Sequence, residues 1–111
     1  MSLPGDDSRS YLDLATVIAV IRLEHHAYGV AIREEIEGFL GRPVALASVY
    51  LGLDRLRRLG WLRVSRCAPV AIPGGRAKRL YQITDDGLRQ LRQQRAQWEW
   101  LWGRLPREYW W

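Results

Sequence analysis

Apolar residues recur at helical spacing in four separate stretches of the chain, and these stretches predict four helices. The first covers residues 10–22, where Ser10 and Asp13 form the pattern of an N-terminal capping box ahead of an almost wholly apolar run. The second covers residues 30–41, in which apolar side chains fall on one face, and Gly41 is its stop signal. We expect the first of these helices to be largely buried.

The third helix is predicted over about residues 47–59, after a short turn, and Gly60 ends it. Arg55 and Arg58 lie off its apolar stripe. The stripe that should face the core consists of Val49, Leu53, Leu56 and Leu59.

Beyond Gly60 the pattern changes from helical to alternating. Residues 61–66 alternate apolar with polar side chains, and residues 80–83 do so more loosely. Pro73 and the two glycines that follow it lie between these runs and are typical of a turn. The pattern predicts an antiparallel β-hairpin with a long basic loop.

The last helix is predicted to begin after Thr84, whose hydroxyl suits an N-cap position. Its first turn carries Asp85 and Asp86, which the helix dipole favours. Its apolar positions continue to Leu105, and Pro106 ends it. No internal repeat or low-complexity segment interrupts this order of elements.

Three helices, a hairpin and a final helix are the layout of a winged helix-turn-helix protein. The predicted fold is therefore mainly α with a small antiparallel β-hairpin. We divide the chain into a winged-helix domain at residues 10–84, a C-terminal helix at residues 85–106 and a Trp-rich tail at residues 107–111.

The length of 111 residues is enough for one domain with its own core. No apolar run is long enough to cross a bilayer, and the first ten residues are polar and acidic, unlike a secretory signal. We therefore expect a cytoplasmic protein with no membrane association. Cys67 is the only cysteine, so we interpret it as a small, partly buried hydrophobe.

The net charge of +5 is concentrated in the middle of the chain. Residues 42–79 contain nine basic residues and one acid, a balance of +8, whereas the rest of the chain has a balance of −3. In a winged helix this segment forms the third helix and the wing, the two elements that contact DNA. The location of the charge therefore favours a surface that binds double-stranded DNA over a charged surface that only faces water.

The candidate DNA contacts differ in their expected roles. Hydroxyls near the start of the third helix suit phosphates or base edges, its arginines suit phosphates, and basic residues beyond the glycines suit the minor groove. Two alternatives remain open, because Tyr50 could be a core-edge aromatic and the glycine pair only a turn. The candidates are Tyr28, Ser48, Tyr50, Arg55, Arg58, Gly74, Gly75, Arg76, Lys78 and Arg79.

The last helix carries more tryptophan side chains than the surface of a monomer should expose. The same helix of a second copy would cover these side chains best, which predicts a two-fold homodimer. A tryptophan there could also line a cavity for a planar aromatic small molecule, although plain packing is the commoner use of such a stripe. The candidate interface or effector residues are Leu91, Trp98, Leu101, Trp102 and Leu105.

Several short groups of residues follow one another in a fixed order between residues 12 and 98. They are Tyr28-Gly29-Val30-Ala31-Ile32, Ser48-Val49-Tyr50, Leu53-Asp54-Arg55-Leu56, Gly60-Trp61-Leu62, Gly74-Gly75-Arg76, Tyr81-Gln82-Ile83-Thr84 and Gly87. In this order and spacing the chain resembles the PadR family of bacterial and archaeal transcriptional regulators. The resemblance implies a dimeric repressor, in some small members of which aromatic compounds bind at the interface beside a tryptophan placed like Trp98.

The sequence departs from the family pattern around the third helix. The family usually has a Ser-Pro-Gly-like lead into this helix and a proline after the tyrosine, whereas residues 45–47 are Ala-Leu-Ala and Leu51 follows Tyr50. Arg57 and Arg58 stand where family members often carry acids. We therefore expect a DNA contact that is more electrostatic than the family norm.

An enzyme would lack its essential groups in this sequence. His25 and His26 are adjacent, without a carboxylate or thiol at motif spacing, and there is no Gly-rich phosphate loop with its lysine. We therefore expect no catalysis, no cofactor and no metal site. The stronger alternative to a sequence-specific DNA-binding regulator is a winged-helix protein-interaction module that lacks specific DNA binding and docks a partner through its Trp-rich tail.

Overall fold

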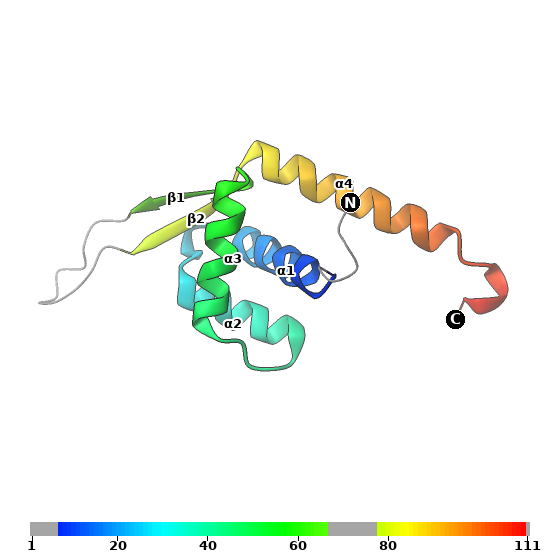
Figure 1. Ribbon diagram of the computed structural model, residues 1–111, viewed down its shortest axis with the longest axis horizontal. Coiled ribbons are helices and arrows are strands. Elements are labelled where there is room, and N and C mark those ends of the chain that lie inside the picture. Colours follow the sequence, from blue (N-terminus) through cyan, green and yellow to red (C-terminus); the bar gives the residue numbers. More distant parts are fainter. Residues whose placement is uncertain (1–6, 67–77, 111) are drawn as a thin grey trace, which may run out of the picture.

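The computed structural model describes residues 7–66 and 78–110 (Figure 1). The described part is mostly helical with one antiparallel hairpin, so the predicted fold class is confirmed. The elements are α1 (Asp7–Leu23), the short 3-10 turn η2 (Glu24–His26), α2 (Gly29–Leu40), α3 (Leu46–Arg58), β1 (Leu62–Arg66), β2 (Arg79–Ile83), α4 (Asp85–Gly103) and the 3-10 turn η3 (Arg107–Tyr109).

The core lies where α1, α2 and α3 meet beneath the hairpin (Figure 1). Each helix contributes apolar residues at helical spacing, such as Ile32 and Ile36 of α2 and Leu53 and Leu56 of α3, none of which is exposed. Burial of such side chains stabilises the fold by about 1.5–3 kcal/mol each relative to exposure. The buried cluster consists of Val17, Ala19, Val20, Ala27, Ile32, Ile36, Val49, Leu53, Leu56, Leu62 and Tyr81.

The hairpin is attached to the helices at two places. Leu62 pairs with Ile83, and Val64 pairs with Tyr81, with the Leu62 and Tyr81 side chains buried in the core. In addition, the backbone N–H of Tyr81 donates a hydrogen bond of 3.0 Å to the carbonyl oxygen of Ala27. The strand that carries part of the wing is therefore fixed directly to the segment between α1 and α2.

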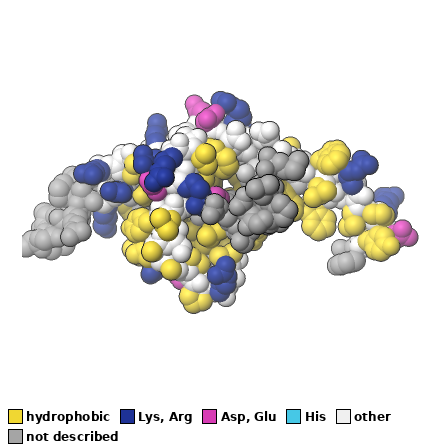
Figure 2. Space-filling view, viewed as in Figure 1, with side chains coloured by type: hydrophobic (Ala, Val, Ile, Leu, Met, Phe, Trp, Pro, Cys, Tyr) yellow, Lys and Arg dark blue, Asp and Glu magenta, His cyan; other side chains and the backbone are white. Residues whose placement is uncertain are grey.

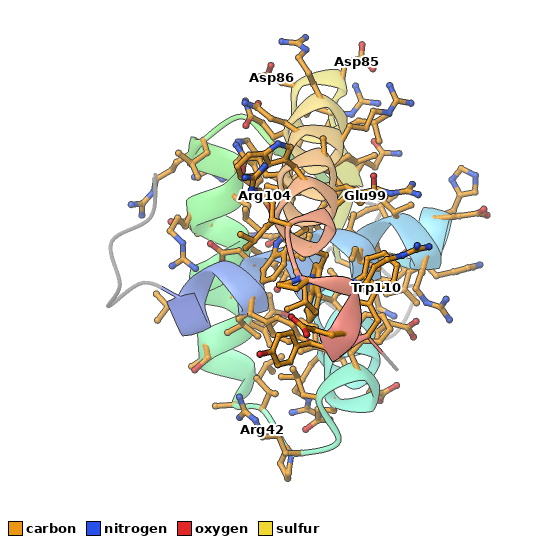
Figure 3. All side chains as sticks on the ribbon, turned by 90° about the vertical axis from the view of Figure 1, so that its right-hand side faces the viewer. Arg42, Asp85, Asp86, Glu99, Arg104 and Trp110 are labelled. Atoms are coloured by element: carbon orange, nitrogen blue, oxygen red, sulfur yellow. The ribbon has the colours of Figure 1, made fainter. Side chains whose placement is uncertain are left out.

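A short turn joins α2 to α3, as the helix-turn-helix prediction requires. Gly41 caps α2 in the left-handed conformation, with φ of 66°, and its N–H donates to the carbonyl oxygen of Glu37 at 2.9 Å. The Glu37 carboxylate in turn accepts a hydrogen bond of 2.9 Å from the N–H of Val44. These contacts fix the direction in which α3 leaves the turn, where Arg42 lies at the edge of the molecule (Figure 3).

Thr84 is the N-cap of α4, as predicted. Its hydroxyl accepts a hydrogen bond of 2.9 Å from the N–H of Gly87 and lies 2.6 Å from the carbonyl oxygen of Gly60, to which it donates. Gly87 is the only buried residue of α4 among those described. Asp85 and Asp86 begin the helix at the end opposite to the C-terminal turn (Figure 3), and the helix then extends away from the core (Figure 1).

Two predicted helix ends are wrong. Helix α1 begins at Asp7, so Ser10 lies inside the helix and is not its N-cap. Helix α4 ends at Gly103, so Leu105 lies beyond it. Pro106 explains this early end, because proline disfavours helical backbone at the residue before it and clashes with the carbonyl of the previous turn.

Candidate DNA-binding surface and C-terminal helix

Helix α3 presents three kinds of surface. One side is buried through Val49, Gly52, Leu53 and Leu56. Lys and Arg side chains gather over the end of α3 that adjoins the hairpin and along the hairpin itself, whereas hydrophobic side chains cover the other end (Figure 2). The first turn has no side-chain cap at Ala45, and Ser48 is exposed there. The exposed hydroxyl and the helix N-terminus are therefore on the outside of the molecule.

Arg55, a predicted phosphate contact, is placed against α1. Its guanidinium contacts the Asp13 carboxylate through two hydrogen bonds, Nη2 to Oδ1 at 2.5 Å and Nε to Oδ2 at 3.3 Å. The Asp13 side chain is 16% exposed and that of Arg55 is 34% exposed. A two-point arginine–carboxylate contact fixes geometry as well as charge, so this pair ties α3 to α1. A DNA contact by Arg55 stays a prediction.

Arg57 and Arg58 share one acidic partner. Arg57 donates to Oδ1 of Asp54 at 2.8 Å, and Arg58 contacts Oδ2 of the same carboxylate. The hydrogen bond from Arg57 is the main reason why the pKa of Asp54 is lowered from its ordinary value. The Arg58 side chain remains 73% exposed, so it is available to a ligand on the outer side of α3.

The two tyrosines among the candidates lie near the start of α2, because Tyr28 is its N-cap residue and Tyr50 of α3 reaches Gly29. Gly29 at the start of α2 is buried, and a Cβ placed there would lie 2.3 Å from the hydroxyl oxygen of Tyr50. The Tyr50 ring thus packs on the α2 backbone while 41% of the residue stays exposed. Tyr28 faces the ammonium of Lys78, whose Nζ is 5.2 Å from the ring centre. Both aromatic rings therefore occupy the border between core and surface.

The described part of the hairpin is strongly basic. Arg66 and Arg79 face each other across the strands, and both are exposed, as is Lys78. Arg63 donates to the Gln82 side chain at 3.1 Å. The wing-tip candidates Gly74, Gly75 and Arg76 lie outside the described residues, as does Cys67.

The second half of α4 is exposed on every side. Among the interface candidates, Leu91 packs against the core and Leu105 is half-buried, but Trp98 is 52%, Leu101 58% and Trp102 63% exposed. Trp100, which was not a candidate, is 65% exposed and stacks on the Arg104 guanidinium at 5.1 Å. The helical repeat places Trp100 on the side opposite to the Leu91–Trp98 stripe.

Trp98 and Trp102 line two separate cavities. The first, of about 490 Å³, lies between α1 and α4 and is lined by Leu14, Ile18, Leu88, Leu91, Arg92, Gln94, Arg95 and Trp98. The second, of similar volume, lies where the chain folds back after α4, and is lined by Trp102, Gly103, Leu105, Tyr109 and Trp110. There the Trp110 indole N–H donates to the carbonyl oxygen of Leu105 at 3.0 Å, which holds the C-terminal turn beside the end of α4 (Figure 3).

Known proteins resemble this chain over most of its length. The family model described as the transcriptional regulator PadR-like family matches residues 17–93. The chain belongs to the PadR-like family. It is therefore a transcriptional regulator by family and fold, and the resemblance read from the sequence is confirmed.

Solved structures of PadR proteins and related regulators share this fold. A transcriptional regulator from Clostridium thermocellum matches with a TM-score of 0.69 and 19% identity, over 90% of this chain and 91% of the other. A PadR-like transcription factor from Bacteroides fragilis matches with a TM-score of 0.65 and 20% identity, over 87% of this chain and 91% of the other. A PadR family regulator from Eggerthella lenta matches with a TM-score of 0.57 and 26% identity, over 90% of each chain. A search of curated proteins gave no match.

Sequence reasoning missed several residues that shape this PadR-like protein. Asp13 was assigned only to a helix cap, although it holds Arg55 from a distance of 42 positions along the chain. Gly29 and Gly87 were treated as motif positions, without the close contacts that explain them. The family match ends at residue 93, so the exposed tryptophans of α4 lie beyond it.

In the part of the chain that the structure describes, no helix has the length and apolar character needed to span a membrane. The same residues contain no group of three His, Cys, Asp or Glu side chains that could hold a metal ion.

Proposed function

We propose that this regulator binds double-stranded DNA sequence-specifically as a homodimer in the cytoplasm and acts as a repressor without catalytic activity. The observation that carries the proposal is the gathering of Lys and Arg side chains over α3 and the hairpin (Figure 2). The exposed cations of these two elements include Arg58, Arg66, Lys78 and Arg79. Phosphate contacts by such side chains position a reading helix on duplex DNA. The acids of α4 and of the α2 surface lie on other elements.

The strength of this contact is expected to be largely electrostatic. Each phosphate that a cation neutralises releases counterions, so the logarithm of the affinity falls with the logarithm of salt concentration by about 0.9 per contact. The Arg58 side chain is 73% exposed despite its contact with Asp54, and Lys78 is exposed although its Nζ lies 5.2 Å from the Tyr28 ring centre. We expect both to be among the phosphate contacts, with Arg55 contributing less because Asp13 holds it.

Salt titration of duplex binding tests the DNA-binding part of the proposal. Fluorescence anisotropy with a labelled duplex gives the slope for the unaltered protein, for Arg58→Ala and for Lys78→Ala. Each substitution should flatten the slope by about one unit. Arg107→Ala is the matched control, because it removes the same charge in η3 at the far end of the molecule (Figure 1) and should leave the slope unchanged.

The rival function, a protein-interaction module, predicts a different result. Such a module would bind duplex DNA weakly, and the three substitutions would have equal effects. If Arg107→Ala changes the salt slope as much as Arg58→Ala does, the proposed DNA-binding surface is wrong.

The homodimer part of the proposal rests on the exposed stripe of α4. A surface helix with Trp98, Leu101 and Trp102 exposed by half or more leaves a contiguous apolar patch in water, which soluble monomers rarely do. A two-fold axis would pair this patch with its own copy and would also double the number of DNA contacts.

The opposite faces of α4 supply a matched test of the dimer. Trp98→Ser combined with Trp102→Ser should shift the protein toward monomer in sedimentation equilibrium, because the paired surface loses its two largest anchors. Trp100→Ser removes an equally exposed indole from the other face and should leave the dimer intact. Equal loss of dimer in both proteins would contradict the pairing through this stripe.

A second function, release of DNA by a planar aromatic effector, is favoured by the cavity between α1 and α4. Its volume of about 490 Å³ is in the range of small-molecule sites, and Trp98 lines it together with Arg92 and Arg95. Binding of flat aromatic compounds should quench tryptophan fluorescence and lower duplex affinity. Trp98→Leu should abolish both effects, and a compound that quenches without releasing DNA would count against an effector role.

A further inference from the structure

The outermost ridge of α3 is apolar over its first half. Residues 47, 51, 54 and 58 are spaced by four, three and four positions, which places them on one line along the helix, opposite to the buried face. The four residues are Ala47, Leu51, Asp54 and Arg58. Leu51 is 69% exposed, more than any other large hydrophobic residue in the described part of the chain.

The apolar half of this ridge, Ala47 and Leu51, belongs to none of the surfaces already assigned. Leu51 has no place in the core, since the buried side of α3 is formed by Val49, Leu53 and their neighbours, and the proposed dimer stripe belongs to α4. Cations lie beyond one end of Leu51, since the exposed Arg58 continues the same ridge and Lys and Arg side chains gather over the hairpin end of α3, whereas hydrophobic side chains cover its other end (Figure 2). A partner that binds the ridge therefore needs anionic groups facing the cations and an apolar group facing Leu51.

Duplex DNA presents this combination in its major groove. Phosphates line the groove edges, and the C5-methyl of thymine is the apolar group that it displays among base edges. The charged groups beside Leu51 are already paired, because Asp54 binds two arginines and Arg55 on the flank is held by Asp13. Arg58, at the hairpin end of the ridge, is the phosphate contact proposed above. The cations near the ridge thus favour DNA as the partner, and the apolar residues of the ridge favour contact with methyl groups.

We propose that Leu51, with Ala47 beside it, contacts thymine C5-methyl groups in the major groove and makes the protein select thymine at those positions. This proposal rests on the DNA-binding function proposed above. It specifies how base selection occurs on this helix: apolar contact selects thymine, while arginines contact the backbone.

The test uses the full chain and removes one methyl group at a time. Duplexes are first selected from a random pool with the unaltered protein, and each thymine of the selected site is then replaced by deoxyuridine, which lacks only the C5-methyl. At one or more positions in each half-site the replacement should weaken binding about fourfold, the effect of withdrawing one methyl-sized group from an apolar contact. For Leu51→Ala the same replacement should have no effect.

Leu59→Ala is the matched control. Leu59 is the C-cap residue of α3 and lies off the ridge. It is 55% exposed, so its predicted place in the core-facing stripe is wrong. It should retain the deoxyuridine effect of the unaltered protein. Thermal melting of both variants checks that the fold is intact, as expected for exposed side chains.

Three results would overturn the inference, and they are distinguishable. If the protein selects duplexes but no thymine methyl affects affinity, thymine reading is wrong while DNA binding stands. If the methyl effect persists in Leu51→Ala, another residue reads the methyl. If the unaltered protein enriches no duplex at all, the DNA-binding function fails and this inference fails with it.

Discussion

Substitution of Gly87 by alanine tests how α4 is seated on the winged-helix core. A Cβ at this position would lie 2.2 Å from the carbonyl oxygen of Trp61 and 2.7 Å from Cδ1 of Ile83. Carbon atoms pack best at roughly 3.5 Å or more, so the first turn of α4 must move outward by about 1 Å. The Trp61 oxygen cannot turn aside freely, because it accepts the backbone hydrogen bond of Thr84 at 3.0 Å.

The expected loss of stability follows from these contacts. Overpacking of a tight site costs about 1–3 kcal/mol, and a strained or lost hydrogen bond adds about 1 kcal/mol. Alanine offsets about 1 kcal/mol of this through its better helix propensity. We therefore expect Gly87→Ala to lower the free energy of unfolding by about 1–3 kcal/mol, and to lower Tm by roughly 5–15 °C.

Urea unfolding followed by tryptophan fluorescence measures this change, with Trp61 directly beside the altered residue. The protomer concentration must be held constant, because pairing of two copies would raise the apparent stability. Gly38→Ala is the control: it is an exposed position of α2 where an added Cβ meets nothing within 4 Å, so stability should rise by up to about 1 kcal/mol. A Gly87→Ala protein as stable as the unaltered one would refute the contact as described.

Three further substitutions test individual contacts of the site. Asp13→Asn should lower the unfolding free energy by about 1–3 kcal/mol in urea, since it leaves the half-buried guanidinium of Arg55 without its charged partner. Gly29→Ala should displace the Tyr50 ring and lower Tm, whereas in a Tyr50→Ala background the same change should be neutral or stabilising. Asp54→Asn should release two arginines and steepen the salt dependence of duplex binding. Because the pKa of Asp54 is lowered in the folded state, its pairs stabilise the protein above the ordinary aspartate pKa; this contribution fades as pH falls through the lowered value, and the Asp54→Asn protein should lack that acid dependence in pH-dependent melting.

The order of elements was predictable because its signals are local. Helical spacing, alternation, and the Thr84 cap each depend on residues within one or two turns of one another. The end of α4 was also encoded locally, by the effect of Pro106 on the preceding residue, but the apolar repeat that continues to Leu105 pointed to a longer helix.

The interior of the site was less predictable because its contacts join distant segments. Arg55 is one of several arginines in a basic stretch, and only the packing of α3 on α1 brings Asp13 to it. In the same way, the need for glycine at position 29 depends on where the Tyr50 ring falls. The helical repeat alone placed Leu59 with the core-facing stripe, whereas the structure leaves it 55% exposed at the end of α3.

The narrow attachment of α4 turns the helix into a lever arm. Its firm seating is confined to the first turns near Gly87, and the helix extends about 24 Å from there to Gly103. A tilt of only about 10° at Gly87 would therefore move the far end of the helix by about 4 Å. In a dimer joined through the two α4 helices, a small change of angle near Trp61 would alter the separation of the two α3 helices. The change would be slightly larger than the rise of one base pair.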